Sequence, residues 1–194
     1  MTTFYLLRHA SNDLVGKAIA GRMPGVSLNH QGQREAERLA TRLGGEPIQM
    51  IFSSPLERAV ETAVPLAKRL GLDIQISDAL NEIDFGVWTK LTFEQLAELP
   101  AWQRWNSFRS GSRVPNGETM LEVQARVVGE IQRLRAEYPE QRLALFSHAD
   151  PLRAALAYFL GVSLDLFQRI EMAPASVSIL HLSEHGPRVE CLNA

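Results

Sequence analysis

The stretch FYLLRHA (residues 4–10) decides the fold. Its first four residues are all apolar or aromatic, so both faces of a strand formed here would be hydrophobic, which is typical of a sheet covered by helices on both sides. Arg8 and His9 follow directly. Because ligands bind beyond the carboxyl ends of the strands in an open parallel sheet, this Arg-His pair is expected at a binding site.

A second stretch, LALFSHAD (residues 143–150), has the same organisation: an apolar run followed by Ser147 and His148. It predicts a second buried strand that also delivers a histidine to the end of the sheet. Further strands are predicted at residues 48–53, 72–77 and 177–182, with an edge strand at residues 188–192.

Helices are predicted between these strands. Asn29 is expected to cap a helix that ends at Gly44-Gly45, and another helix is expected from about Thr119 to Tyr138. The alternation predicts an α/β fold: a three-layer α/β/α sandwich, with a mostly parallel sheet and helices on both faces. We expect one domain over residues 1–194, within which residues 81–117 form a partly helical excursion over the active site.

Two further helices follow strands directly. Ser54 is the predicted N-cap of one, with Pro55 as its first residue, and Gly71 is predicted to end it. Asp150 is the predicted N-cap of the other, which Gly161 is predicted to end. Helix N-termini have free N–H groups and a partial positive charge, so both would favour an anion at this edge of the sheet.

Four side chains converge on that edge: Arg8, His9, Arg58 and His148. Each one alone has an ordinary structural explanation, such as a hydrogen-bonded histidine or a surface arginine. Together they indicate a phosphate pocket, because the planar guanidinium group matches the oxygens of a phosphoryl group and stays charged.

The overall composition excludes some classes of partner. The chain has 194 residues, 45% of them hydrophobic, and a formal net charge of −2, which favours neither nucleic acid nor an anionic membrane as partner. Its single cysteine, Cys191, excludes an intrachain disulfide and is typical of a reducing compartment. No apolar run reaches the ~20 residues that span a membrane, so we expect a cytoplasmic protein. The apolar runs 156–170 and 177–182 fit a homodimer contact as well as they fit the core.

Five segments, in this order, resemble the motifs of the histidine phosphatase superfamily, the phosphoglycerate mutase-like proteins. LLRHA is similar to the Arg-His-Gly signature of that family, and the other four segments are similar to its later motifs. These are SSPLERAVETA (53–63), LNEIDFGVW (80–88), PNGETMLEVQARV (115–127) and FSHADPLRAAL (146–156). The resemblance covers nearly the whole chain.

The resemblance implies a role for each residue of the pocket. His9 would attack phosphorus and form a phosphohistidine, while Arg8, Arg58 and a protonated His148 would bind the phosphoryl oxygens. Glu82 would donate a proton to the leaving oxygen, with Asp84 as a second candidate for this role. Neither a metal ion nor another cofactor is expected.

This chain departs from the family motif after His9. Ala10 replaces the usual glycine, and Ser11-Asn12 replaces a common Glu-Thr pair. Asn12 and Arg22 are candidate substrate-binding residues, although a structural role in the loop of residues 10–29 is an equally good interpretation. Further candidates for substrate contacts come from the excursion: Trp102, Arg104, Trp105, Arg109 and Arg113.

The function predicted is hydrolysis of small phosphorylated metabolites, that is, of phosphomonoesters. A phosphoglycerate mutase is the first alternative, but the resemblance implies that dedicated mutases are longer. A second alternative is a metal enzyme in which His9, Glu82, His148 and Asp150 are ligands, and the adjacent arginines disfavour it. The third is a phospholigand-binding protein without catalytic activity.

Overall fold

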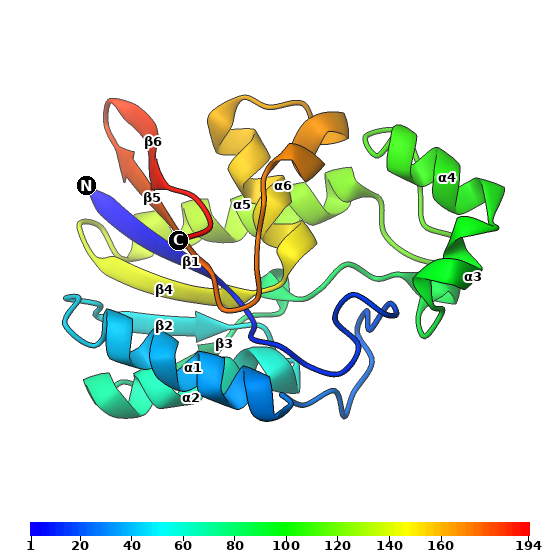
Figure 1. Cartoon of the computed structure of the whole chain (residues 1–194). Helices are drawn as coiled ribbons and strands as arrows, with labels where there is room; N and C mark the ends of the chain where they lie inside the picture. Colours follow the sequence, from blue (N-terminus) through cyan, green and yellow to red (C-terminus); the bar gives the residue numbers. More distant parts are fainter.

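The computed structural model describes residues 1–194 and contains one six-stranded sheet. Its strand order is β3-β2-β4-β1-β5-β6 (Figure 1). The first four of these strands are parallel, whereas β5 is antiparallel to β1, and β6 to β5. The strands are β1 (Thr2–Arg8), β2 (Met50–Ser53), β3 (Ile74–Ile76), β4 (Arg142–Ser147), β5 (Val177–Ser183) and β6 (Gly186–Cys191).

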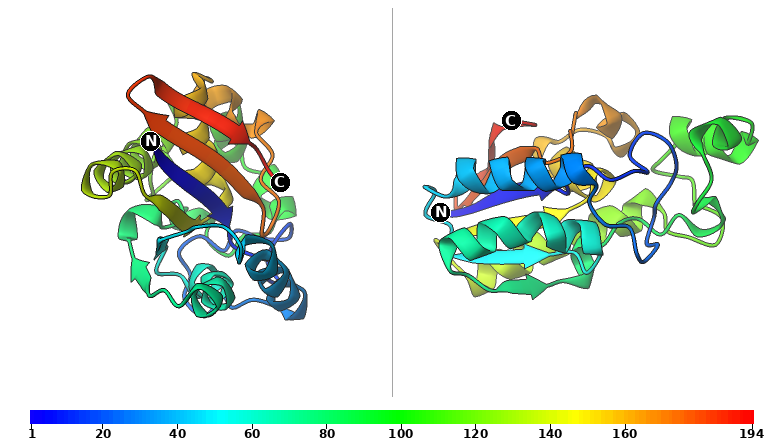
Figure 2. Two further views of the ribbon diagram at one scale, coloured as in Figure 1. Left: turned by 90° about the vertical axis from the view of Figure 1, so that its left-hand side faces the viewer. Right: turned by 60° about the horizontal axis from the view of Figure 1, so that its bottom comes forward.

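Helices cover both faces of this sheet, so the predicted three-layer α/β/α architecture with a mostly parallel sheet is confirmed (Figures 1 and 2). One face packs against α1 (His30–Leu43) and α2 (Glu57–Leu70). The other packs against α5 (Met120–Glu137) and α6 (Ala149–Leu160). The predicted cap of α1 is also confirmed, because the side chain of Asn29 accepts a hydrogen bond from Gly32 N.

Strand β1 explains why the FYLL run has no polar residue. Tyr5 and Leu7 belong to the core on the side of α1 and α2, whereas Phe4 and Leu6 belong to the core on the side of α5 and α6. All four are at most 2% exposed. Alternate side chains of a strand point to opposite faces, so burial on both sides requires an uninterrupted apolar run.

Strand register brings the two histidines to one place. Arg8, the last residue of β1, pairs with Ser147, the last residue of β4. His9 and His148 therefore leave the carboxyl edge of the sheet side by side, and their ring centroids are 5.2 Å apart.

The predicted starts of α2 and α6 are wrong. Helix α2 begins at Glu57 with Leu56 as its N-cap, and α6 begins at Ala149 with His148 as its N-cap. The hydroxyl of Ser54 lies 2.8 Å from Nε2 of His148, and the carboxylate of Asp150 contacts two arginines, so tertiary contacts engage both of the predicted capping side chains.

The predicted helix ends are confirmed. Gly71 ends α2 and Gly161 ends α6, each with φ near 68°. This left-handed conformation is easily accessible only to glycine.

The excursion of residues 81–117 is partly helical, as predicted, and projects beyond the sheet (Figure 1, right). It contains α3 (Phe93–Ala97), α4 (Pro100–Ser107) and a turn of 3₁₀ helix, η2 (Gly86–Trp88). Three tryptophans form its interior: the Trp88 ring centroid lies 5.3 Å from that of Trp102 and 5.6 Å from that of Trp105. Two more 3₁₀ turns, η1 (Asp78–Leu80) and η3 (Leu164–Arg169), complete the elements.

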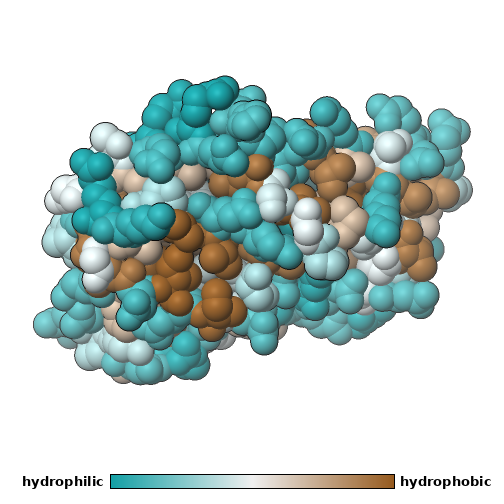
Figure 3. Space-filling view, turned by 90° about the horizontal axis from the view of Figure 1, so that it is seen from below, coloured by the Kyte–Doolittle hydropathy of each residue, from teal (hydrophilic) through white to brown (hydrophobic).

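Most of the surface seen from below is hydrophilic, with an apolar area in the left-hand half of the view (Figure 3). Strand β3 is at the edge of the sheet, and its Ile76 is 54% exposed. None of the helices combines the length and the apolar character needed to cross a bilayer.

Candidate active site

A cavity of about 260 Å³ opens where β1 and β4 end. Four predicted site residues line its inner part: Arg8, His9, Arg58 and Glu82. The outer part is formed by the loop of residues 10–29, by the excursion and by the first turn of α6. The sequence prediction therefore identified residues from three separate segments that the fold brings together.

His9 is held in a single orientation. Its Nδ1 lies 2.8 Å from the main-chain oxygen of Ala10. A carbonyl oxygen only accepts, so Nδ1 carries the hydrogen and Nε2 of the neutral ring has a free lone pair. Burial, together with the charges of Arg58 and Arg8, lowers the pKa of His9 to about 3. The imidazole is therefore neutral at physiological pH.

The guanidinium groups of Arg58, which is buried, and of Arg8, which is half-buried, flank His9 and retain buried donors without partners. Arg58 is 1% exposed and donates from Nη2 to the main-chain oxygen of Gly21 at 2.8 Å, but its Nε and Nη1 have no hydrogen-bond partner. Arg8 donates from Nη1 to the main-chain oxygen of Met172, and its Nε also lacks a partner. Because unsatisfied buried donors are costly, these atoms indicate a site for an anion.

His148 lies beside His9 and is completely buried, but it does not line the cavity. Its Nε2 contacts the hydroxyl of Ser54 at 2.8 Å, and its Nδ1 has no hydrogen-bond partner. Burial and the charge of Arg58 hold the pKa of His148 well below its usual value. This ring is therefore neutral at physiological pH. The predicted role of a protonated His148 concerns the step in which a phosphoryl group is bound, and it stays a prediction.

The pKa of Glu82 is shifted upwards, in the direction opposite to that of His148. Burial, followed by the negative charge of Asp150, raises the pKa of Glu82 to about 7. One carboxylate oxygen, Oε1, accepts a hydrogen bond from Ile83 N at 2.8 Å. A carboxyl group with this pKa can give and take protons at neutral pH. Asp84, the second candidate for the proton donor, does not line the cavity, and its side chain accepts from Gly86 N.

The two candidate substrate-binding residues of the loop have different positions. Asn12 lines the cavity and is 4% exposed, and its Oδ1 accepts from Leu14 N at 3.0 Å. Arg22 does not line the cavity, so of its two predicted interpretations the structural role is the one that the structure favours. Its guanidinium group instead donates to the main-chain oxygen of Glu82 and to the carboxylate of Glu118, which holds it away from the cavity.

The outer part of the cavity contains polar residues that the sequence prediction assigned otherwise or missed. Asp150, predicted to be a helix cap, contacts Nη1 of Arg109 at 3.4 Å and Nη1 of Arg153 at 3.2 Å. Asn106 and Gln168 also line this part. Asp150 and Arg153 lie in the first helical turn after His148, and this spacing could have predicted that both line the cavity. No sequence pattern connected Gln168 with the cavity.

Two candidates of the excursion, Trp102 and Arg109, line the cavity, whereas three others do not. These three are Arg104, Trp105 and Arg113. Trp105 instead packs under Arg109, with the guanidinium carbon 3.6 Å from its ring centroid. Trp105 therefore supports Arg109 from behind the cavity wall.

No group of three or more His, Cys, Asp or Glu side chains is arranged to hold a metal ion. The fixed cations beside His9 are Arg8 and Arg58, whose charges repel a divalent cation.

Comparison with known proteins identifies the family. Residues 4–194 match the sequence model of the histidine phosphatase superfamily (branch 1). The chain belongs to the histidine phosphatase superfamily. The resemblance of the five sequence segments to this superfamily is thereby confirmed.

Individual members of the superfamily are similar over nearly the full chain. Phosphoserine phosphatase 1 of Hydrogenobacter thermophilus is 31% identical over 198 residues, which cover 100% of this chain and 92% of that protein. The probable phosphoglycerate mutase GpmB of Cronobacter sakazakii is 28% identical over 92% of this chain and 84% of its own length. Among solved structures, mycobacterial glucosyl-3-phosphoglycerate phosphatase Rv2419c is 28% identical with a TM-score of 0.88, covering 99% of this chain and 98% of that one. This histidine phosphatase is a phosphoric monoester hydrolase, with mutases among its relatives.

Proposed function

We propose that the protein hydrolyses small phosphorylated metabolites through a phosphohistidine on Nε2 of His9. The observation that carries this proposal is the orientation of the His9 ring, with Nδ1 bound to the main-chain oxygen of Ala10 and buried, unpartnered donors of Arg8 and Arg58 nearby. A neutral imidazole with one free nitrogen, beside donors for the phosphoryl oxygens, is arranged for in-line attack on phosphorus.

In the first step, the lone pair of His9 Nε2 forms a bond to phosphorus, and the bond between phosphorus and the leaving oxygen breaks. Arg8 and Arg58 bind the phosphoryl oxygens, over which negative charge is spread in the transition state. Glu82 gives its proton to the leaving oxygen. Its pKa of about 7 supports this role, because half of the molecules retain the proton at that pH.

In the second step, Glu82 is a carboxylate and takes a proton from a water molecule. The hydroxide formed attacks phosphorus, the P–N bond breaks, and its electron pair returns to Nε2 of His9. Inorganic phosphate leaves, and both side chains are back in their starting states. His148 has an unpartnered Nδ1, so the dianionic phosphoryl group would favour its protonation once bound.

The outer cavity supports a substrate with a second negative charge. Arg109 and Arg153 supply two positive charges there and Asp150 one negative charge, which leaves an excess of one positive charge. The N–O distances of these two ion pairs, 3.4 and 3.2 Å, are longer than the roughly 2.7–2.9 Å of a strong charged hydrogen bond. The two arginines can therefore also bind a ligand. Phosphoserine and glucosyl-3-phosphoglycerate, the substrates named for two similar proteins, both carry a carboxylate.

The deciding experiment compares the wild type with His9→Ala and with a control, His185→Ala, which changes an exposed histidine outside the cavity. Release of 4-nitrophenol from its phosphate ester is measured from pH 5 to 8 in excess EDTA. Rapid acid-free quenching with ³²P-labelled substrate then tests for an alkali-stable, acid-labile phosphoenzyme. We expect turnover and label in the wild type and the control, and neither in His9→Ala.

The alternatives give different results. Equal turnover by His9→Ala would refute the nucleophile, and turnover that EDTA abolishes would indicate a metal enzyme. Phosphate binding without turnover of any phosphomonoester would indicate a binding protein. Interconversion of phosphoglycerates that requires a bisphosphate primer would indicate a mutase. A preference for 3-phosphoglycerate over glycerol 3-phosphate in kcat/KM would support the second negative charge.

A further inference from the structure

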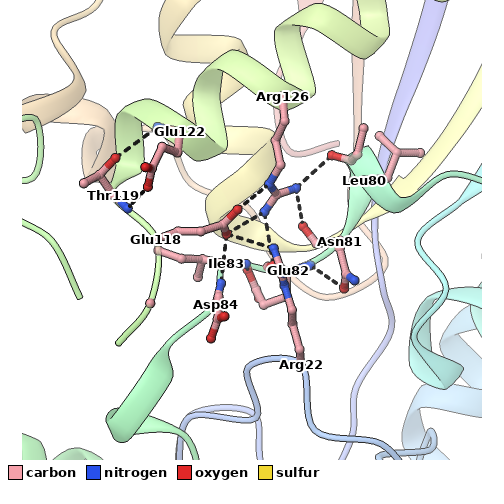
Figure 4. Close-up of polar contacts among 12 residues, drawn as sticks. Arg22, Leu80, Asn81, Glu82, Ile83, Asp84, Glu118, Thr119, Glu122 and Arg126 are labelled. Atoms are coloured by element: carbon pink, nitrogen blue, oxygen red, sulfur yellow. Dashed lines mark hydrogen bonds and ion pairs between the residues drawn. The ribbon is translucent and has the colours of Figure 1, made fainter. Parts of the chain in front are cut away.

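A set of side chains outside the cavity holds the segment that carries Glu82 (Figure 4). Arg126, on α5, donates from Nη1 to the main-chain oxygens of Ala79 and Asn81 at 2.8 and 2.7 Å. Its Nη2 donates to the main-chain oxygen of Glu82 at 3.1 Å. One guanidinium group therefore binds three carbonyl groups in four consecutive residues.

The remaining carbonyl group in this run is also bound by a side chain. The hydroxyl of Ser147 donates to the main-chain oxygen of Leu80 at 2.6 Å, and Arg22 adds a second donor, Nε, to the oxygen of Glu82 at 2.8 Å. Asn81 and Glu82 lie outside any helix or strand. Beyond the η1 turn, which Asn81 N closes on Asp78 O, the backbone here thus takes its position from side chains of other segments.

Glu118 orients the two arginines that make these contacts. Its Oε1 accepts from Nε of Arg126 at 3.0 Å, and its Oε2 accepts from Nη2 of Arg22 at 2.9 Å. Oε2 also accepts from Asp84 N at 2.9 Å, two residues beyond Glu82. We call Arg22, Glu118 and Arg126 the Glu118 network; none of the three lines the cavity.

Proton transfer makes strict demands on the position of Glu82. A proton donor has to stand about 2.6–3.2 Å from the oxygen that it protonates. A displacement of roughly 1 Å can cost about 100-fold in rate. The carboxyl group of Glu82 has one hydrogen bond, from Ile83 N, which is the next residue, and its Oε2 lies 3.9 Å from Nδ1 of His148, so its position depends mainly on the local backbone.

We infer that Arg126 and Glu118 are positioning residues for proton transfer by Glu82, and that Arg22 joins the loop of residues 10–29 to the same network. This inference rests on the proposed role of Glu82 as the proton donor. The network touches neither substrate nor the reacting atoms, and it acts through the backbone of residues 79–84.

A positioning role of this kind predicts a selective defect. An aryl phosphate with a weakly basic leaving oxygen, such as 2,4-dinitrophenyl phosphate, needs no proton donor, whereas an alkyl phosphate such as glycerol 3-phosphate does. In Arg126→Met we expect kcat/KM for glycerol 3-phosphate to fall by about 100-fold and that for 2,4-dinitrophenyl phosphate by less than about threefold. Glu82→Gln is expected to show the same pattern with a larger loss.

The matched control is Arg133→Met, on the same helix. Arg133 pairs with Glu130 and Glu137 and is 51% exposed, so its removal should leave the ratio of the two kcat/KM values as in the wild type. An equal loss with both substrates in Arg126→Met, or no loss, would overturn the positioning role. If Glu82→Gln itself showed no selective loss, the proton-donor role would be refuted as well, so the two failures are distinguishable.

A second variant covers the case in which Arg126→Met does not fold. Glu118→Gln keeps the size of the side chain but places an amide N–H group against the N–H donors of its partners. It should lose activity selectively with glycerol 3-phosphate, and a uniform loss would again overturn the inference. Circular dichroism and thermal unfolding of each variant establish that a folded protein is compared.

Discussion

Nδ1 of His148 lies 3.9 Å from Oε2 of Glu82. Burial opposes a charge on both groups: it lowers the pKa of His148 and raises that of Glu82. Below pH 7 most molecules therefore have both groups neutral before substrate binds, and the positive charges at the inner end of the cavity are those of Arg8 and Arg58. A phosphoryl group bound here would therefore lie near two fixed cations and near two groups, His148 and Glu82, that can gain or lose a proton.

The pH dependence of the reaction should follow Glu82. Its protonated form is the proposed proton donor, so kcat/KM for glycerol 3-phosphate should fall as the pH rises through about 7. The charge of Asp150 contributes to this raised pKa. In Asp150→Asn the pKa of Glu82 drops, and the alkaline limb of the pH profile should move to lower pH.

The comparison protein for that profile is Asp165→Asn. Asp165 accepts hydrogen bonds from Ser110 and lies outside the cavity. The alkaline limb of the pH profile of Asp165→Asn should coincide with that of the wild type. An unchanged or higher limb in Asp150→Asn would show that Asp150 does not set the protonation of Glu82.

Acid should destabilise the protein through its buried histidines. In the unfolded chain His9 takes up a proton below pH 6.5, whereas in the folded protein its pKa is about 3. Between these values the unfolded state binds more protons, so the free energy of unfolding falls as the pH is lowered. From pH 7 to pH 5 the loss is about 2 kcal/mol for one such group.

Denaturant unfolding at both pH values measures this loss. His9→Asn should lose less stability than the wild type over the same interval, because it lacks one of the buried groups. His185→Asn, which changes an exposed histidine, should keep the slope of the wild type. Parallel slopes in all three proteins would contradict a buried, neutral His9.

A hydroxyl group joins the segment after β1 to α2. Thr62 Oγ1 accepts from Ala10 N at 2.9 Å and donates to the main-chain oxygen of Arg58 at 2.6 Å, and it is fully buried. Thr62→Val leaves the N–H of Ala10 without a partner and should reduce the free energy of unfolding by about 1–3 kcal/mol. Thr41→Val, an exposed threonine with the same bond to the preceding turn, should change it by less than about 0.5 kcal/mol.

Two glycines should respond oppositely to alanine. A Cβ at Gly32 would lie 2.0 Å from the main-chain oxygen of Ser11, so Gly32→Ala must displace the start of the loop of residues 10–29 and should destabilise the protein. A Cβ at Gly129, in the exposed part of α5, meets nothing within 4 Å. Gly129→Ala should stabilise by about 0.5–1 kcal/mol. Equal thermal shifts would contradict the close approach at Gly32.

The sequence was most informative where a local pattern has one physical solution. The FYLL run and its repeat before His148 predicted buried parallel strands, and these strands deliver both histidines to one edge. Glycines in the left-handed conformation likewise ended two helices where predicted.

Contacts between distant segments could not be predicted in the same way. Ser54 and Asp150 both have the residue type of an N-cap, yet the first contacts His148 and the second contacts Arg109 and Arg153. Arg22 belongs to a loop of which several other residues line the cavity, but its own side chain is bound to Glu118. Such choices depend on which partner the folded chain brings within reach, and no local spacing encodes that.

The position of β1 between β4 and β5 has a consequence for biosynthesis. Residues 2–8 are synthesised well before both of their partners in the sheet, which are residues 142–147 and 177–183. The nascent chain therefore carries an apolar strand without a neighbour until most of the polypeptide has been made. The segment that precedes the proposed nucleophile thus needs protection from aggregation during translation, and the edge of the sheet that holds His9 is assembled only after residues 142–147 and 177–183 are made.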